Sequence, residues 1–297
     1  MNAILVIDKH GGMTSHDVVK EVRKLTGERS VGHLGTLDPM ATGVLPLVLG
    51  KYTRLAQFYG SSDKEYEGTI RLGFSTDTYD SEGVATSAKV EPRVAIEEIR
   101  TAAAKFVGRI QQMPPAYSAK KIAGVPAYKL ARKDKPVELK AVEVKVKEFA
   151  LNALDACTVS FTARVSSGTY IRSLAHDLGQ ILGCGAHLAS LRRTRSGEFK
   201  DEQAISLESI RSSMSDNEDY VNQPTGQGWI HPRSILPALP AVTADEASLA
   251  KLRHGNAVNL PEFTRAATVK VFADRDTLAA IAKRVAGTLF HPSVVLL

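Results

Sequence analysis

The chain has 297 residues, of which 43% are hydrophobic and 24% charged, a balance typical of globular proteins that argues against disordered, fibrous and membrane-spanning classes. Its net charge of +6 favours a polyanionic partner, because lysine and arginine that neutralise phosphates release condensed counterions. With only two cysteines, Cys157 and Cys184, and no apolar run long enough for a signal peptide or a membrane span, we expect a cytoplasmic protein without disulfides.

The first expected elements are a strand and a helix. The apolar run Ile4–Ile7 indicates a buried strand. Thr14 and Asp17 have the spacing of a capping box, so a helix is expected to follow and to end at Gly27. The residues on its apolar face are Val18, Val19, Val22 and Leu25.

A long ordered loop is expected next. Residues 28–43 are polar and rich in glycine, and a loop of this length inside a compact domain is a candidate functional segment. Val44–Leu49 resumes as a strand, in which Pro46 indicates an edge or irregular position because proline cannot donate to the ladder.

Residues 64–74 alternate between apolar and polar, which predicts a half-buried strand. Its apolar face comprises Tyr66, Gly68, Ile70, Leu72 and Phe74. A polar turn (75–83) and a helix ended by Gly108 are expected to follow, the helix being marked by Ile96, Ile99, Ala103 and Phe106.

After a segment rich in proline and lysine (111–135), the pattern predicts two more strands and a helix. One strand carries Val142, Val144 and Val146, and the other carries Cys157, Val159, Phe161, Ala163 and Val165. The helix runs from about Tyr170 to Leu182. This mixed order favours an α+β fold with a largely antiparallel sheet.

Residues 211–235 are polar and contain glycine and proline, which indicates a linker or a long surface loop. We therefore expect a catalytic domain over 1–235 and a small module over 236–297. Cys184 and His187 have a spacing that zinc could use, but the other ligands of a zinc site are missing, so no metal site is expected.

The segment Val31–Gly43 is the strongest candidate for chemistry. Its glycines permit positive φ angles, while Pro39 fixes its own φ and favours an extended Asp38, so the loop can hold one carboxylate in a defined place. An aspartate before a proline is by itself typical of a turn.

This segment closely resembles the catalytic loop of the TruB family of tRNA pseudouridine synthases, which make pseudouridine in the T loop of tRNA. Further blocks of the family occur in the same order, so the resemblance covers roughly residues 4–200. They are Lys64-Glu65-Tyr66, Thr76-Asp77-Thr78-Tyr79-Asp80, Gln112–Ala119, Gly168-Thr169-Tyr170-Ile171-Arg172 and Gly185–Arg193.

The resemblance implies the pseudouridine synthase fold and a role for individual residues. Asp38 matches the catalytic aspartate, which would either attack ribose C1′ or remove the C2′ proton, and both schemes remain open. Arg172 matches the arginine that pairs with this aspartate and orients it.

The same resemblance implies a pocket for a flipped uracil, since the base must leave the folded loop before its atoms can react. Tyr66 matches the aromatic that stacks on the base, and Tyr170 matches a second pocket tyrosine that could accept the C5 proton. Leu191 matches an apolar wall, and His33 matches the histidine that fills the place vacated in the T loop.

The implied substrate is tRNA, bound through its T loop and T stem, with no cofactor, no membrane, no obligatory protein partner and a monomeric enzyme. The alternatives are a guide-RNA-dependent synthase subunit and an RNA-binding protein that helps tRNA to fold. The end of the chain resembles a PUA-like RNA-binding module in position and size. Basic residues are expected at the surface, some of them on phosphates. They are Lys120, Lys121, Arg132, Lys133, Lys135, Arg192, Arg193 and Arg195.

Overall fold

A computed structural model describes residues 1–118, 120–122, 125–127, 139–153, 155, 157–216, 226–260 and 265–297. Arg132, Lys133 and Lys135, and the side chain of Lys121, lie outside this description. Within the described ranges, no helix is long and apolar enough to cross a membrane.

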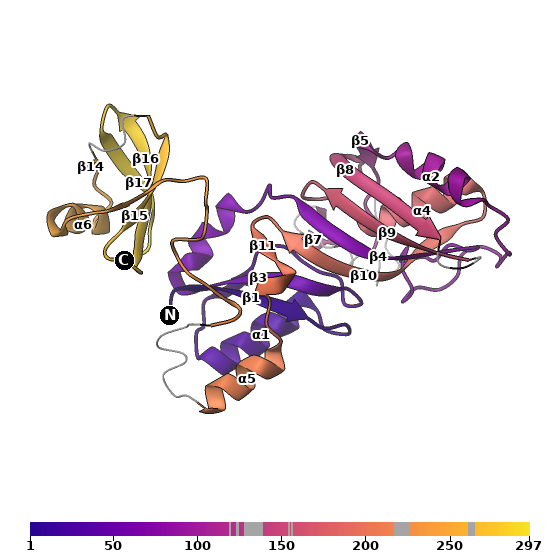
Figure 1. Ribbon diagram of the computed structural model, residues 1–297, viewed down its shortest axis with the longest axis horizontal. Coiled ribbons are helices and arrows are strands. Elements are labelled where there is room, and N and C mark those ends of the chain that lie inside the picture. The colour runs from indigo at the N-terminus through magenta and orange to yellow at the C-terminus, as the bar shows by residue number, and fades with distance from the viewer. Residues whose placement is uncertain are drawn as a thin grey trace.

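One large sheet forms the centre of the molecule (Figure 1). Its strands, in spatial order, are β12 (Trp229–Ile230), β1 (Ala3–Lys9), β3 (Thr42–Leu49), β10 (Ala186–Ser196), β4 (Lys64–Leu72), β9 (Thr158–Val165), β8 (Val142–Ala153) and β5 (Gly108–Gln112). The short strand β2 (Val31–His33) pairs with β3, and β11 (Phe199–Lys200) pairs with β10. The pair β3–β10 is parallel and the other described pairs of this sheet are antiparallel, so the expected α+β fold is confirmed.

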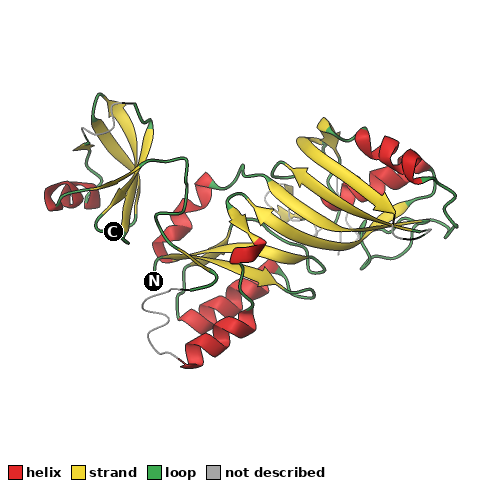
Figure 2. Cartoon of the chain, in the orientation of Figure 1, coloured by secondary structure: helices red, strands yellow, loops and turns green. Residues whose placement is uncertain are grey.

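Two helix pairs pack on this sheet. The helices α1 (Ser15–Thr26) and α5 (Leu207–Asp216) lie together near β1 and β3, while α2 (Ile96–Ala104) and α4 (Ile171–Leu182) lie together near β8 and β10 (Figures 1 and 2). Apolar side chains from the sheet and the helices form one continuous core. The 3-10 turns η1 (Gly50–Phe58) and η2 (Asp201–Gln203) and a small hairpin, β6 (Lys121–Ile122) with β7 (Val125–Pro126), complete this part of the chain.

The last part of the chain forms a second, five-stranded sheet (Figure 1). Its strands, in spatial order, are β13 (Ala241–Thr243), β15 (Thr268–Phe272), β16 (Leu278–Ala286), β17 (Leu289–Val295) and β14 (Val258–Asn259), and the helix α6 (Glu246–Arg253) accompanies them. A hydrophobic cluster joins it to the first sheet, because Ile4 and Val6 of β1 lie in the same cluster as Phe272 and Ile281.

The predicted start and end of α1 are confirmed. Thr14 accepts a hydrogen bond from the Asp17 N–H at 3.1 Å, and the Asp17 carboxylate accepts one from the Thr14 N–H at 3.1 Å, which completes the capping box. Gly27 ends the helix with φ = 68°, a left-handed conformation that glycine adopts without steric cost.

The expected loop over residues 28–43 is partly wrong, because Val31–His33 forms β2 and β3 already begins at Thr42. Of the two positions expected for Pro46, the edge is wrong, since β3 has neighbours on both sides, but the irregular position is confirmed, because Pro46 lies outside the ladders that β3 forms with β2 and with β10. The carbonyl of Pro46 accepts from Leu34 N–H at 2.9 Å on the side away from β1. A backbone N–H at position 46 would point to the same side. On that side β2 pairs only with Leu47–Leu49 and β10 only with Thr42–Gly43, so no ladder hydrogen bond is lost at Pro46.

Two boundaries also differ from expectation. The helix α2 ends at Ala104, and Gly108 instead begins β5. The expected linker also contains regular elements, since α5 extends into it as far as Asp216 and β12 pairs with β1. Ile210 of α5 and Trp229 of β12 are buried in the core, and the polar composition of the segment gives no sign of this burial. Residues 217–225 of that linker lie outside the described part of the chain.

Candidate active site

The loop between β2 and β3 carries Asp38 and is fixed on both sides of it. Before Asp38, the Ser15 hydroxyl accepts the Leu37 N–H at 2.8 Å and donates to the Leu37 carbonyl at 3.1 Å. After it, the Pro39 carbonyl accepts from the Gly12 N–H at 2.9 Å and from the Lys9 ammonium at 3.1 Å. The backbone around the carboxylate is therefore held in place before any ligand binds.

Lys9 is buried beneath this loop, with 1% of its surface exposed. Its ammonium also donates to the carbonyls of His10 at 2.8 Å and Met13 at 2.7 Å. Burial lowers the pKa of Lys9 to about 8, and the negative charge of Asp38 opposes that shift. Lys9 thus supports the loop both by hydrogen bonds and by its charge.

Arg193 fixes the first half of the loop from β10. Its guanidinium donates to the carbonyls of Val44 at 2.8 Å, Gly35 at 3.0 Å and Thr36 at 3.3 Å. The close approach of β10 requires glycine at position 43, where φ is 95° and a Cβ would lie 2.3 Å from the Arg193 carbonyl oxygen. The expectation that Arg193 lies at the surface is wrong, because only 1% of it is exposed.

Asp38 and Arg172 form an ion pair at the centre of the site. The Arg172 Nε lies 2.9 Å from Asp38 Oδ2, and its Nη2 donates to Asp38 Oδ1 at 3.1 Å, so both carboxylate oxygens are engaged. The same guanidinium donates to the carbonyls of Thr78 at 3.0 Å and Tyr117 at 2.9 Å, and its Nη1 lies 3.4 Å from Asp80 Oδ2. Arg172 is 4% exposed and is therefore fixed in one orientation.

The surroundings of Asp38 shift its proton affinity. Burial of the carboxylate raises the pKa of Asp38 above the ordinary aspartate value of 3.8, the Arg172 charge opposes this rise, and the nearby Asp80 adds to it. A third of the side chain, 33%, nevertheless remains exposed, so the carboxylate stays accessible to a ligand.

The structure brings all six predicted site residues together around one cavity of about 590 Å³, a volume in the range of small-molecule sites. They are His33, Asp38, Tyr66, Tyr170, Arg172 and Leu191. The residues come from four separate parts of the chain, namely β2 with the loop that follows it, β4, the start of α4 and β10.

The aromatic walls are positioned by backbone contacts. Tyr170 precedes α4, and the buried side chain of Gln112 accepts its N–H at 2.8 Å and donates to its carbonyl at 3.0 Å. Burial raises the pKa of the Tyr170 phenol. Tyr66 is half-buried on β4, and Leu191 is 7% exposed on the neighbouring strand β10.

His33 enters the cavity as a neutral imidazole near neutral pH. Burial lowers its pKa below 6.5, and the charge of Arg193 lowers it further. Its Nδ1 accepts the Gly35 N–H at 3.3 Å, which leaves Nε2 to carry the proton.

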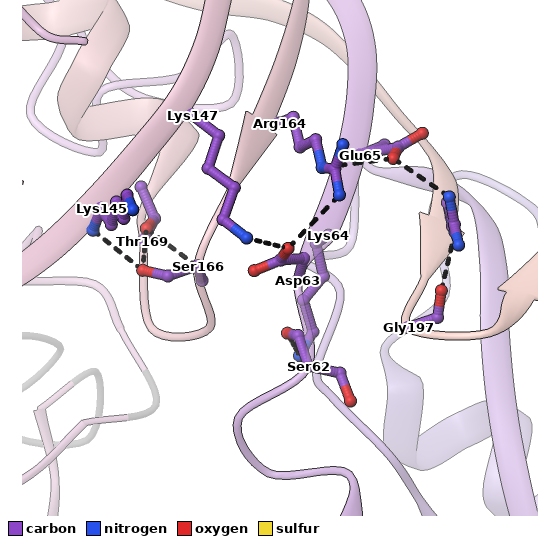
Figure 3. Close-up of polar contacts among 11 residues, drawn as sticks. Ser62, Asp63, Lys64, Glu65, Lys145, Lys147, Arg164, Ser166, Thr169 and Gly197 are labelled. Carbon is purple, nitrogen blue, oxygen red and sulfur yellow. Dashed lines mark hydrogen bonds and ion pairs between the residues drawn. The ribbon is translucent and has the colours of Figure 1, made fainter. Parts of the chain in front are cut away.

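Charged residues outside the cavity form a network at the adjoining ends of the strands (Figure 3). Lys147 is paired with Asp63, and Arg164 lies 3.7 Å from both Asp63 and Glu65. Arg195 lies 3.4 Å from Glu65 and donates to the Gly197 carbonyl at 2.7 Å. These cations are partly exposed, and each has a carboxylate partner.

Sequence patterns missed several residues that support the site, above all Lys9, Asp80, Gln112 and Arg193. Asp80, Gln112 and Arg193 lie in the sequence blocks already noted, and that position was a usable signal. Arg192, also expected at the surface, keeps 30% of its side chain exposed and is paired with Asp8 at 3.0 Å and with Asp201 at 2.5 Å.

Residues 23–171 of the chain match the model of the TruB family pseudouridylate synthase (N terminal domain), and residues 172–232 match the tRNA pseudouridylate synthase B C-terminal domain. The chain is 47% identical over 300 residues to tRNA pseudouridine synthase B of Solibacter usitatus, covering 100% of both proteins. It is 38% identical over 290 residues to the protein of that name from Geotalea uraniireducens, covering 95% of this chain and 92% of that protein.

Solved structures with a similar fold include an H/ACA RNP bound to a substrate RNA containing 2′-deoxyuridine. Its matching chain has a TM-score of 0.70 and 26% identity, covering 99% of this chain and 85% of that one. A chain of a Cbf5-Nop10-Gar1 complex has a TM-score of 0.68 and 28% identity, covering 96% of this chain and 79% of that one.

Proposed function

The chain belongs to the TruB family of pseudouridylate synthases, and from this membership we propose that it converts the T-loop uridine of tRNA, position 55, to pseudouridine with Asp38 as the catalytic carboxylate. It is an isomerase that acts on uridine in tRNA. The observation that carries the assignment of the site is the Asp38–Arg172 pair on the wall of a cavity that Tyr66 also lines.

The reaction exchanges one bond of the ribose for another. The bond from C1′ to uracil N1 breaks, the base turns, and C1′ joins C5, while the C5 proton is lost and N1 gains one. In one scheme Asp38 attacks C1′ and is displaced when C5 bonds to C1′. In the other, Asp38 removes the C2′ proton and later returns that proton to C2′. In both schemes Arg172 holds the carboxylate toward the ribose, because it contacts both oxygens.

The cavity suits a base that has left its stack. Flipping costs a few kcal/mol, and stacking on the Tyr66 ring, worth about 1–3 kcal/mol, offsets much of that cost. Leu191 supplies an apolar wall, and Tyr170, which lines the same cavity, is the group we assign to accept the C5 proton. His33 lies at the edge of the loop, where it can fill the place that the base leaves.

The proposed enzyme acts alone on tRNA in the cytoplasm, as a monomer. The guide-RNA-dependent reading is supported by the fold shared with the H/ACA RNP, while the full-length relatives named tRNA pseudouridine synthase B favour the stand-alone reading. The candidate site residues line one cavity with the Asp38–Arg172 pair, which favours catalysis over a purely tRNA-folding role.

The purified chain is expected to release tritium from a T-arm hairpin labelled at uracil C5, with no guide RNA or second protein added. A hairpin with cytidine at the target position is the control and should release none. A requirement for an added guide RNA would support the alternative synthase, and tight binding without any release would support the RNA-folding protein.

The pH profile of kcat/KM is expected to lose activity toward acid at a pH above 3.8. Asp38 must be ionised to react, and its raised pKa means that protons inactivate it at a higher pH than they would an ordinary aspartate. Asp80 raises the pKa of Asp38, so Asp80→Asn should move the acid limb to lower pH. Tritium release measured between pH 3.5 and pH 8 (about the range set by ordinary carboxylates and neutral pH) tests this.

Asp77→Asn is the matched control, because Asp77 lies in the same turn and its carboxylate accepts the Val84 N–H at 2.8 Å, away from Asp38. It should leave the acid limb in place. An acid limb that Asp80→Asn does not move, or moves to higher pH, contradicts the proposed protonation of Asp38.

A further inference from the structure

Two buried cations line the candidate cavity without a carboxylate partner among the described residues. Lys64 is 8% exposed and donates to the Ser62 carbonyl at 2.6 Å. Arg193 is 1% exposed and donates only to backbone carbonyls, those of Gly35, Thr36 and Val44. Both side chains contribute to the wall of the cavity.

The two cations flank the loop that carries Asp38. A Cβ built on Gly35 would lie 3.6 Å from Arg193 Nη1 and 3.8 Å from Lys64 Cε, so the two side chains approach the same point of the loop. Lys64 and Tyr66 lie on the same face of β4, about 7 Å apart along the strand. The two residues therefore project from the same side of the strand, and both line the cavity.

Burying unpaired charge is costly, so these two cations need an explanation. Burial lowers the pKa of Lys64 and the charge of Arg193 lowers it further, while the charge of the neighbouring Asp63 opposes the shift, so the surroundings on balance disfavour the charged ammonium. The neighbouring cations outside the cavity are neutralised. Lys147 is paired with Asp63 (Figure 3), and Arg195 is paired with Glu65. Among the described residues, Lys64 and Arg193 differ from these cations, and from Arg172 in the same cavity, in having no carboxylate within ion-pair distance.

An ammonium has three N–H donors, and the Ser62 carbonyl accepts only one of those of Lys64. A singly charged oxyanion in the cavity would take the remaining donors and neutralise one buried charge. The RNA backbone supplies such an anion at every nucleotide. Arg193 is too buried to contact this anion directly, but its positive charge adds to the electrostatic potential where the anion would bind.

We propose that Lys64, supported from behind by Arg193, is the binding subsite for one backbone phosphate of the RNA, the phosphodiester that flanks the nucleotide stacked on Tyr66. This subsite rests on the proposed function, since it needs an RNA strand in the cavity. Lys64 binds the phosphate directly, and Arg193 is a positioning residue that orients the Asp38 loop and adds positive potential.

The test combines Lys64→Met with a series of T-arm hairpins. In each hairpin one loop phosphate is replaced by an uncharged methylphosphonate. Kd is measured in an Asp38→Asn background, so the RNA is not consumed. Lys64→Met is expected to weaken binding of the unmodified hairpin about 10- to 100-fold, as for a lost hydrogen bond to a charged group. A methylphosphonate at the flanking position should weaken binding to the chain that retains Lys64 by a similar factor, and should cost little more once Lys64→Met is present.

Lys147→Met is the matched control, because Lys147 is exposed and paired outside the cavity. It should change Kd by less than about threefold and should be additive with every methylphosphonate. Because Met is apolar and Lys64 is an unpaired buried cation, Lys64→Met should leave Tm unchanged or raise it. A purely structural lysine would instead lower Tm together with binding.

The proposal is overturned if the losses from Lys64→Met and from every methylphosphonate add, or if no methylphosphonate weakens binding to the chain that retains Lys64. The scan with Lys64 in place needs no substituted lysine, so it can still overturn the proposal even if Lys64→Met fails to fold. Failure of the proposed function is seen separately, as an absence of tritium release by the unsubstituted chain on the unmodified hairpin.

Discussion

Asp38→Asn is expected to abolish pseudouridine formation while leaving tRNA affinity within about threefold. Loss of a nucleophile costs about 10⁶-fold in kcat, and loss of a general base about 10²- to 10⁴-fold. Asparagine keeps the shape of the side chain, and Arg172 keeps its bonds to the carbonyls of Thr78 and Tyr117 and its neighbour Asp80. The site should therefore remain folded but lack the oxygen that reacts.

Single-turnover tritium release from tRNA labelled at uracil C5 measures the chemical step, and Kd for the same tRNA measures binding. Asp63→Asn is a suitable control, because it removes another carboxylate that is paired with basic residues, but outside the cavity. The size of the loss bears on the mechanism, since a decrease near 10⁶-fold favours attack at C1′ over removal of the C2′ proton. Normal release by Asp38→Asn refutes its assignment.

Arg172→Lys is expected to lower kcat about 100-fold, the loss that a displacement of about 1 Å in a reacting group produces, with little change in KM. The guanidinium contacts both oxygens of Asp38 and also binds the carbonyls of Thr78 and Tyr117. A lysine has one nitrogen and cannot span these partners, so the carboxylate would lose its fixed orientation although the charge remains.

The measurement separates kcat from KM on the T-arm hairpin and records Tm for each chain. Arg71→Lys is the control, because Arg71 is exposed on β4, away from the cavity. A variant whose kcat is unchanged, or whose activity falls only in proportion to the folded fraction, contradicts a positioning role for Arg172.

Much of the fold follows from local patterns in the sequence. The alternation of 64–74 predicts β4, and the Thr14–Asp17 box with Gly27 predicts α1, because these signals depend on neighbours within a few residues. The short strands β2 and β12 were missed. Each is two or three residues long and exists because of a partner strand far along the chain, β3 for one and β1 for the other.

The distinction between local signals and contacts from distant parts of the chain applies to the site as well. Resemblance identified residues that a loop or strand pattern alone leaves as ordinary turn and packing residues, such as Asp38 and Tyr66. It assigned no supporting role to Lys9 or Arg193, because their bonds to the carbonyls of the distant residues Pro39 and Gly35 are marked by no local pattern. For the same reason composition alone predicted a surface position for Arg193, whereas its burial depends on the parallel pairing of β10 with β3.

The most direct measurement of the central claim maps pseudouridine in tRNA from cells that lack this chain. Asp38 as the catalytic carboxylate of a T-loop synthase predicts that uridine at position 55 stays unmodified, that the unsubstituted chain restores its conversion, and that Asp38→Asn does not. Conversion of that uridine in cells lacking the chain, or its restoration by Asp38→Asn, would contradict the claim.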